Sequence, residues 1–178
     1  MAIEEPPKNG RSTDVAYGLG VDAQDNARIS RIRRAAAGDC DSIVDLIAEL
    51  RRDDAGTDID RQPSLAAVRA AVESTSCTVL VAEADNAVLG FIVSHWVPFP
   101  MLGGTEAYIS DLVVSRRRRG QGIGRRLVSD IEIEARRRGC VRVMLNNRMS
   151  AESFRRSFYP KMGFRVRDDF ANFVKTLR

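Results

Sequence analysis

The stretch SRRRRGQGIG, residues 115–124, joins a β-rich run to an amphipathic helical pattern. Its glycines, Gly120, Gly122 and Gly124, would let backbone amides approach an anion without side chains in the way. The start of the following helix adds unpaired N–H groups and the positive end of the helix dipole. Arginines on both sides of the glycines add positive charge. These features predict a loop that binds a phosphate or a pyrophosphate.

Two common phosphate-binding motifs do not match this loop. The glycines are spaced GxGxG, which differs from the GxGxxG of dinucleotide-binding folds, and no Gly-Lys-Ser/Thr follows as in a Walker loop. A tight turn from strand to helix, with no ligand, is the alternative interpretation of the glycines alone.

The residues before the loop predict one strand, two helices and three further strands. Asp39 or Asp41 could cap the first helix, whose apolar stripe runs from Ile43 to Leu50, and Pro63 could begin the second. The strands are expected at 29–34, 78–84, 87–96 and 107–114.

The residues after the loop predict a helix that ends at Gly139, a strand at 141–145 and a second helix at 151–162. The first of these helices has the apolar stripe Ile123, Leu127, Val128, Ile131 and Ala135. A final hairpin is expected from strands at 164–167 and 170–177. The predicted order βααβββαβαββ corresponds to an α/β fold with a mixed sheet flanked by helices.

Length and composition favour one domain with an N-terminal leader. The chain has 178 residues, of which 44% are hydrophobic, and residues 1–27 show no sustained periodicity, so we expect a disordered leader and a single domain at 28–178. Two basic and five acidic residues give the leader a formal charge of −3, which leaves +7 for the rest of a chain with a net charge of +4. No membrane span, signal peptide or paired cysteine motif is recognisable, which favours a cytoplasmic protein.

A second motif, FYPKMGF at residues 158–164, follows the loop by one strand and part of a helix. Together the two motifs resemble the GNAT superfamily of acetyl-CoA-dependent N-acetyltransferases, and the resemblance covers residues 28–178. The family's loop, Arg/Gln-x-x-Gly-x-Gly/Ala, is matched by Arg119, Gly122 and Gly124. Its C-terminal motif, Phe-Tyr-x-Lys-x-Gly-Phe, is matched by Phe158, Tyr159, Lys161, Gly163 and Phe164.

The resemblance implies where acetyl-CoA would bind. The strand before the loop would separate from the next strand, and acetyl-CoA would lie in the gap. The implied cofactor-binding residues are Leu112, Val113 and Val114 for the pantetheine arm, Arg119, Gly120, Gln121, Gly122, Ile123, Gly124 and Arg125 for the pyrophosphate, and Asn146 or Asn147 at the end of the following strand. The chain departs from the family pattern at Glu152, often Asn, and at Arg155, where a small residue is common.

Transfer of an acetyl group to an amine requires an acid for the departing thiolate and a base for the amine. The resemblance implies that Tyr159 is the acid, and a tyrosine is protonated at neutral pH. Asp111 and Glu106 are the candidate bases, with a solvated or ion-paired carboxylate as the alternative for each. His95 is the only histidine, and we interpret it as structural.

An acidic run could recruit the acceptor. In the GNAT fold this loop borders the acceptor site, so the carboxylates of Asp53, Asp54, Asp58 and Asp60 would attract a cationic amine. A solvated surface loop is the alternative. The run lacks calcium-loop spacing, and we expect no metal site.

The sequence therefore predicts an N-acetyltransferase that moves the acetyl group of acetyl-CoA to a primary amine in a ternary complex. A non-catalytic acyl-CoA-binding or regulatory domain and a basic nucleic-acid-binding protein are the alternatives. Tyr159 argues against the first, and the lack of aromatics among the arginines argues against the second. We expect no nucleic-acid or membrane partner. The apolar loop at 97–104 could serve as a lid or as the contact of a homodimer.

Overall fold

The computed structural model describes residues 31–177. The elements are β1 (Arg31–Arg34), η2 (Ala37–Asp39), α1 (Cys40–Ala55), α2 (Arg61–Glu73), β2 (Cys77–Ala84), β3 (Ala87–Phe99), η3 (Pro100–Leu102), β4 (Gly104–Val114), η4 (Arg116–Arg118), α3 (Ile123–Arg137), β5 (Cys140–Leu145), α4 (Glu152–Arg155) and η5 (Pro160–Met162). The predicted leader, residues 1–27, lies outside the described residues.

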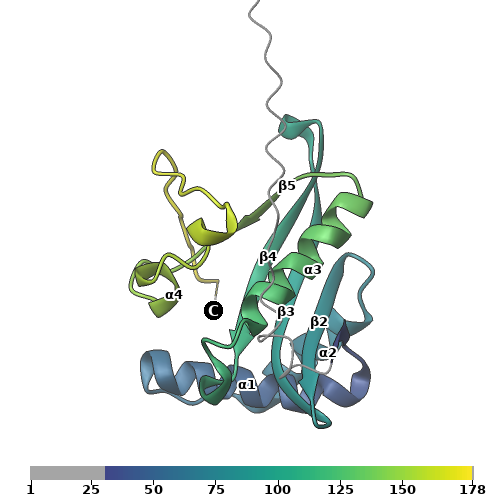
Figure 1. The fold of residues 1–178 in the computed structure, drawn as a ribbon, viewed down its shortest axis with the longest axis vertical. Coiled ribbons are helices and arrows are strands. Elements are labelled where there is room, and N and C mark those ends of the chain that lie inside the picture. The colour runs from purple at the N-terminus through teal and green to yellow at the C-terminus, as the bar shows by residue number, and fades with distance from the viewer. Residues whose placement is uncertain (1–30, 178) are drawn as a thin grey trace, which may run out of the picture.

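The five strands form one mixed sheet in the order β1-β2-β3-β4-β5. Neighbouring strands are antiparallel from β1 to β4, and β5 is parallel to β4. Helix α3 makes the crossover from β4 to β5, as a parallel pair requires. Figure 1 shows α3 lying along one face of the sheet, with α1 across its lower end. The predicted mixed sheet flanked by helices is confirmed through β5.

The core has a layer on each face of the sheet. On one face, the predicted stripe of α3 is buried, and Leu127, Val128 and Ile131 pack with Ile92 and Ile109 of the central strands. On the other face, α1 and α2 cover a cluster formed by Ile43, Leu46, Val79, Val81, Phe91, Val93 and Val113. Apolar burial on both faces fixes the long central strands β3 and β4, which carry the candidate site.

The starts of the first two helices differ from the sequence prediction. Asp39 precedes α1, but its carboxylate binds the backbone N–H of Ala36 and the guanidinium of Arg33 rather than the amides of α1. Helix α2 begins at Arg61, two residues before Pro63, because Asp60 caps it by accepting a hydrogen bond from the Gln62 amide.

The segment predicted as a loop at 97–104 is mostly part of a hairpin. β3 continues to Phe99, and the register pairs Val97 with Glu106 and Phe99 with Gly104. Only the η3 turn, Pro100–Leu102, lies outside the ladder, and Met101 at its tip is exposed. The apolar residues of this segment therefore extend the sheet.

The C-terminal predictions are partly wrong. The helix expected at 151–162 is reduced to α4 and the η5 turn, because Ser157 adopts a positive φ of 54° and Pro160 has no N–H to continue a helix. The hairpin expected from 164–167 and 170–177 is absent from the structure as described. Phe173, Val174 and Leu177 are instead exposed and belong to no strand.

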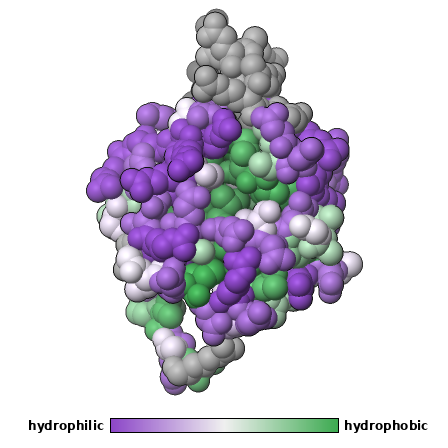
Figure 2. All heavy atoms as spheres, turned by 90° about the horizontal axis from the view of Figure 1, so that it is seen from below, coloured by the Kyte–Doolittle hydropathy of each residue, from purple (hydrophilic) through white to green (hydrophobic). Residues whose placement is uncertain are grey.

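The surface is largely hydrophilic. Seen from below, charged and polar side chains cover most of the molecule, and apolar side chains show in recesses between them (Figure 2). None of the helices in residues 31–177 is long and apolar enough to cross a membrane.

Candidate active site

The site begins where β4 and β5 separate. Their parallel pairing ends at Ile109 and Leu145, and β4 then continues to Val114 with β3 as its only partner. We call this separation the fork; Figure 1 shows the two strands diverging there. In a β-strand, backbone groups alternate between the two sides, so part of 110–114 points toward the open side with no strand to bind. The predicted separation of the strand before the loop is thus present.

A bulge in β4 lies at the start of the fork. Val93 pairs with Asp111 and Ser94 pairs with Ile109, so Ser110 has no partner on β3. A bulge bends its strand and redirects the neighbouring side chains. It places the exposed side chains of Ser110 and Asp111 at the point where the β5 side of the strand becomes open.

The phosphate loop (residues 115–124) follows the open stretch of β4. Gly120 and Gly122 have positive φ values of 76° and 78°, which side chains disfavour. Gly122 is the N-cap of α3, and no side chain caps this helix end. The first amides of α3 are therefore available to an anion. The predicted strand–glycine loop–helix arrangement is present. Gly124, the second residue of α3, lies close to the ring of Phe158, which a Cβ at this position would approach to 3.4 Å.

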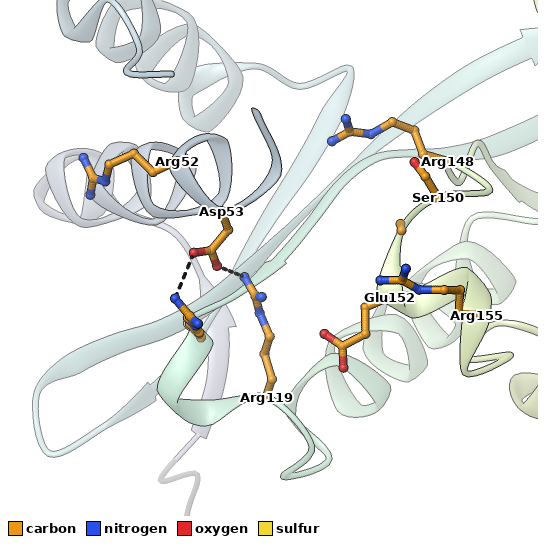
Figure 3. A pocket seen from close by; sticks show the side chains of 9 residues that line it. Arg52, Asp53, Arg119, Arg148, Ser150, Glu152 and Arg155 are labelled. Carbon is orange, nitrogen blue, oxygen red and sulfur yellow. Dashed lines mark hydrogen bonds and ion pairs between the residues drawn. The ribbon is translucent and has the colours of Figure 1, made fainter. Parts of the chain in front are cut away.

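A cavity of about 650 Å³ adjoins this loop. Figure 3 shows its two walls: the end of α1 with the phosphate loop, and the segment around α4. The lining residues are Arg52, Asp53, Arg116, Arg119, Arg148, Ser150, Ala151, Glu152 and Arg155. Five arginines and two carboxylates make it a predominantly positive cavity suited to phosphate groups. Both departures from the family pattern, Glu152 and Arg155, lie in this lining.

Two acidic residues of α1 hold the phosphate loop. Glu49 accepts hydrogen bonds from the Arg116 amide at 2.5 Å and from the Ser115 hydroxyl at 3.4 Å. One turn later, Asp53 binds Arg119 at 3.1 Å and Arg116 at 3.4 Å. The sequence prediction missed Glu49, since only the folded chain brings α1 against residues far along the sequence. The Nε of Arg119 also donates to the Val114 carbonyl at 3.2 Å.

The acidic run is not gathered into one site. Asp53 faces the phosphate-loop arginines, Asp58 pairs with Arg52 at 3.1 Å, and Asp60 caps α2. The side chain of Asp54 lies outside the described residues. Binding of a cationic acceptor by this run stays a prediction, and the placement of Asp53 ties it to the phosphate loop.

Tyr159 packs on the core cluster on which Leu112 and Val114, from the open part of β4, also pack. Its ring is in edge contact with Phe158 at 4.9 Å and Phe164 at 5.7 Å between centroids. Burial raises the pKa of Tyr159 to about 12, so the hydroxyl is protonated at neutral pH. The hydroxyl makes no hydrogen bond within residues 31–177 and is available to a ligand.

The two asparagines after β5 have different surroundings. Asn146 donates from Nδ2 to the hydroxyl of Tyr108 at 3.2 Å. This hydrogen bond connects the residue after β5 to β4, next to the point where the two strands separate. Asn147 accepts a hydrogen bond from Ser153 of α4 at 3.1 Å. Cofactor binding by either residue stays a prediction.

The two candidate bases, Glu106 and Asp111, differ in their exposure and in their bonding partners. Glu106 is 3% exposed and bound to Arg142 of β5, so this carboxylate serves an internal ion pair. Asp111 is exposed and accepts a 2.7 Å hydrogen bond from the Ser110 hydroxyl. Ser110 in turn lies 3.0 Å from Nε2 of His95 on β3. No sequence pattern indicates these linked hydrogen bonds, because they depend on the bulge that brings Ser110 next to His95.

The chain belongs to the acetyltransferase (GNAT) family, which its sequence matches over residues 43–164. It is therefore an acyltransferase by family, and the predicted resemblance is confirmed. No curated protein matches the chain. Within residues 31–177, no group of His, Cys, Asp and Glu side chains is arranged to hold a metal ion.

Solved structures share the fold. A possible acetyltransferase from Clostridium difficile 630 has a TM-score of 0.73 at 17% identity, with 83% of this chain and 98% of that chain covered. A transcriptional regulator from Bacillus halodurans C-125 has a TM-score of 0.71 at 22% identity, covering 83% and 100%. A ribosomal-protein-alanine N-acetyltransferase from Brucella melitensis biovar Abortus 2308 has a TM-score of 0.65 at 18% identity, covering 83% and 98%. At these identities the likeness concerns the fold.

Proposed function

We propose that this protein transfers the acetyl group of acetyl-CoA to a primary amine, by direct attack within a ternary complex. The observation that carries the proposal is the continuity of the fork with the phosphate loop. The stretch 110–114 of β4, which has no strand on its β5 side, leads directly into a helix start with uncapped amides and an arginine-rich cavity. An extended thiol-bearing arm that ends in a pyrophosphate has the chemistry to occupy both parts.

Unsatisfied polar atoms at the phosphate loop support this fit. Oε1 of Gln121 and Nη1 of Arg126 are buried and have no hydrogen-bond partner in the structure as described. Buried polar groups are costly without partners, and an anion would satisfy the arginine while ordered water or a ligand hydroxyl would satisfy the amide oxygen. The backbone amides at the start of α3 would hold the pyrophosphate, with Arg119 adding a charged contact.

Bound acetyl-CoA would supply a thioester, which is already activated for attack by a neutral amine. The chain's own residues then have three tasks. Backbone N–H groups of the open β4 stretch polarise the thioester carbonyl and stabilise its developing negative charge. Tyr159 donates its hydroxyl proton to the departing sulfur. A base accepts a proton from the amine nitrogen as that nitrogen forms the new C–N bond and the C–S bond breaks.

The acceptor is proposed to be a primary amine, and a cationic one is favoured by the exposed carboxylates Asp58 and Asp111. The surplus of arginine is explained by the phosphate loop and cavity, so no nucleic-acid partner is needed to account for it. A cytoplasmic location and a homodimer stay predictions.

The test is release of free CoA thiol from acetyl-CoA with a panel of small amines, amino-terminal peptides and polyamines, with the N-acetyl product identified by mass spectrometry. Thiol release that depends on one acceptor class supports the proposal. Tight acetyl-CoA binding with no product for any acceptor would instead favour a non-catalytic acyl-CoA-binding domain. Salt-dependent DNA binding without acetyl-CoA binding would favour the nucleic-acid alternative.

A further inference from the structure

A chain of hydrogen bonds crosses from β3 to β4 at the start of the fork. Nε2 of His95 lies 3.0 Å from Oγ of Ser110, and this oxygen lies 2.7 Å from Oδ2 of Asp111. All three side chains are at least partly exposed, so a substrate can reach them. Ser110 is the bulged residue of β4, and the β5 partner ends one residue before it. These three hydrogen-bonded side chains therefore lie where the proposed acetyl transfer would take place.

The chemistry of the three groups fixes the direction of these hydrogen bonds. An ionised carboxylate has no proton to give, so Ser110 must donate its single hydroxyl proton to Asp111. The serine oxygen can then only accept from His95, which requires Nε2 to carry a proton. In the neutral imidazole, Nδ1 must then hold the free lone pair. Nδ1 makes no hydrogen bond within residues 31–177 and can accept a proton.

We propose that His95 is the general base of the transfer reaction, with Ser110 and Asp111 as positioning residues; this rests on the proposed function. His95 takes a proton on Nδ1 from the attacking amine nitrogen. The resulting imidazolium is stabilised by the negative charge of Asp111, transmitted through the serine hydroxyl, in the way that a carboxylate supports the histidine of a catalytic triad. An ammonium substrate loses two protons in forming an amide. One leaves to solvent through His95, and the other balances the proton that the sulfur takes from Tyr159.

Other groups around His95 do not supply this function. Tyr108 lies opposite it on β4, with ring centroids 6.4 Å apart, and its hydroxyl accepts from Asn146. Cys77 lies opposite it on β2, and its thiol donates to the Ala71 carbonyl of α2. Glu106, farther along β4, is bound to Arg142. Asp111 is thus the carboxylate connected to the imidazole among the described residues.

The first test does not depend on turnover. His95 is the only histidine of the 178-residue chain, so its imidazole ¹⁵N and ¹H signals are unambiguous in NMR spectra. The neutral ring should show the Nε2–H form, and Asp111→Asn should shift the Nε2–H signal because it changes the group that accepts the Ser110 proton. Asp45→Asn, which changes an exposed carboxylate paired with Arg61, is the matched control and should leave the imidazole signals unchanged. An Nδ1–H form, or imidazole signals insensitive to Asp111→Asn, would overturn the proposed chain of hydrogen bonds.

The second test separates catalysis from structure. With a weakly basic amine that is neutral at pH 7, His95→Gln should lower kcat/KM by about 100-fold, within the range for loss of a general base. The acceptor then contributes no protonation step of its own, so the acidic limb of the pH profile should disappear, and acetyl-CoA affinity should be unchanged. Ser110→Ala should also lower kcat/KM, but by less than His95→Gln does. Ser110→Thr should keep the activity of the wild type, because threonine retains the hydroxyl. An unchanged acidic limb in His95→Gln refutes the catalytic role. If the wild type acetylates no amine, the proposed function fails. The NMR result still decides whether the hydrogen bonds that connect His95, Ser110 and Asp111 exist as proposed.

Discussion

The carboxylate of Asp53 lies 3.1 Å from the guanidinium of Arg119, and this contact joins the last turn of α1 to the phosphate loop. Asp53 also binds Arg116, at 3.4 Å. A phosphate group entering the loop would need these same guanidinium groups. The acidic side chain therefore competes with the ligand for the positive charge of the site.

Removing the negative charge of Asp53 should strengthen the binding of acetyl-CoA. Asp53→Asn is expected to lower the Kd of acetyl-CoA by a few-fold, corresponding to about 1 kcal/mol for a partly exposed ion pair, and to steepen its dependence on salt. Calorimetric titration at two salt concentrations measures both effects. Asp45→Asn is the control, because its ion pair with Arg61 lies away from the phosphate loop. Weaker binding in Asp53→Asn would mean that the carboxylate positions the arginines rather than competes for them.

The two loop glycines provide a matched pair. Gly120 and Gly122 have nearly the same positive φ, so Gly120→Ala and Gly122→Ala should each lose about 1 kcal/mol of folding stability. Only Gly122 is the N-cap of α3, next to the free amides. We therefore expect Gly122→Ala to weaken acetyl-CoA binding by at least ten-fold more than Gly120→Ala does. Equal affinities in the two folded variants would remove the helix N-terminus from the binding site.

Asp39 should contribute to stability in a pH-dependent way. Hydrogen bonds from Arg33 hold the pKa of its buried carboxyl below the usual value, so the contribution is present above about pH 4 and is lost as the pH falls through the lower pKa of the folded state. Asp39→Asn should cost about 2 kcal/mol at pH 7, because it removes the carboxylate that binds Arg33 through both oxygens, while Arg33 keeps its ion pair with Glu83.

Urea denaturation at pH 7 and near pH 3 measures this effect. The difference in the free energy of unfolding between wild type and Asp39→Asn should be smaller at the lower pH. Asp45→Asn, which breaks an exposed ion pair with Arg61, should cost less than about 1 kcal/mol at either pH. A constant difference across the pH range would show that Asp39 acts through packing rather than through its charge.

The sequence predicted the parts of the molecule that local chemistry determines. The helical stripe of Ile123, Leu127 and Val128 is buried as expected, and the glycine loop begins α3. What it could not predict depends on contacts between distant residues. The bulge at Ser110, the attachment of Glu49 to the loop and the ion pair of Glu106 with Arg142 each require a register or a packing arrangement. The contact of His95 with Ser110 depends on the same bulge, so a sequence that suggests a structural histidine does not reveal it.

The missing C-terminal strands illustrate the limit of local sequence patterns. Phe170, Phe173 and Val174 are residue types that favour strands, but a strand also depends on packing against neighbouring strands and a buried face. In the structure these side chains are exposed, with Phe173 91% exposed.

Deleting residues 168–178 should accordingly change little. The described part of this segment contributes no strand and no buried side chain, so we expect the melting temperature to shift by less than about 2 °C. Thermal unfolding followed by circular dichroism measures it. Deletion of 158–178, which also removes Phe158, Tyr159 and Phe164 from the core cluster, is the contrasting variant and should be severely destabilised. A large loss in the shorter deletion would mean that the segment pairs with β5 or with another copy in solution.

Tyr159 is the proposed acid of the reaction, and its hydroxyl can be removed without removing its ring. Tyr159→Phe keeps the ring that packs between Phe158 and Phe164 and removes only the hydroxyl, so the melting temperature should fall little. If the hydroxyl protonates the departing sulfur, kcat should fall by about 100-fold, the lower part of the range for a general acid, because a thiolate can also leave unprotonated. The affinity for acetyl-CoA should stay the same, since the proton is transferred only in the transition state.

The pH dependence gives a second, independent check of Tyr159. Because burial raises its pKa to about 12, the hydroxyl keeps its proton throughout the alkaline range in which an ordinary tyrosine ionises. Wild-type kcat should therefore show no decline centred near pH 10 with an amine that is already neutral there. Steady-state kinetics between pH 7 and pH 10.5 tests this, with Tyr159→Phe measured in parallel to correct for effects unrelated to the hydroxyl. A decline near pH 10 in the wild type alone would assign Tyr159 an ordinary pKa. Wild-type turnover in Tyr159→Phe would remove the hydroxyl from the mechanism altogether.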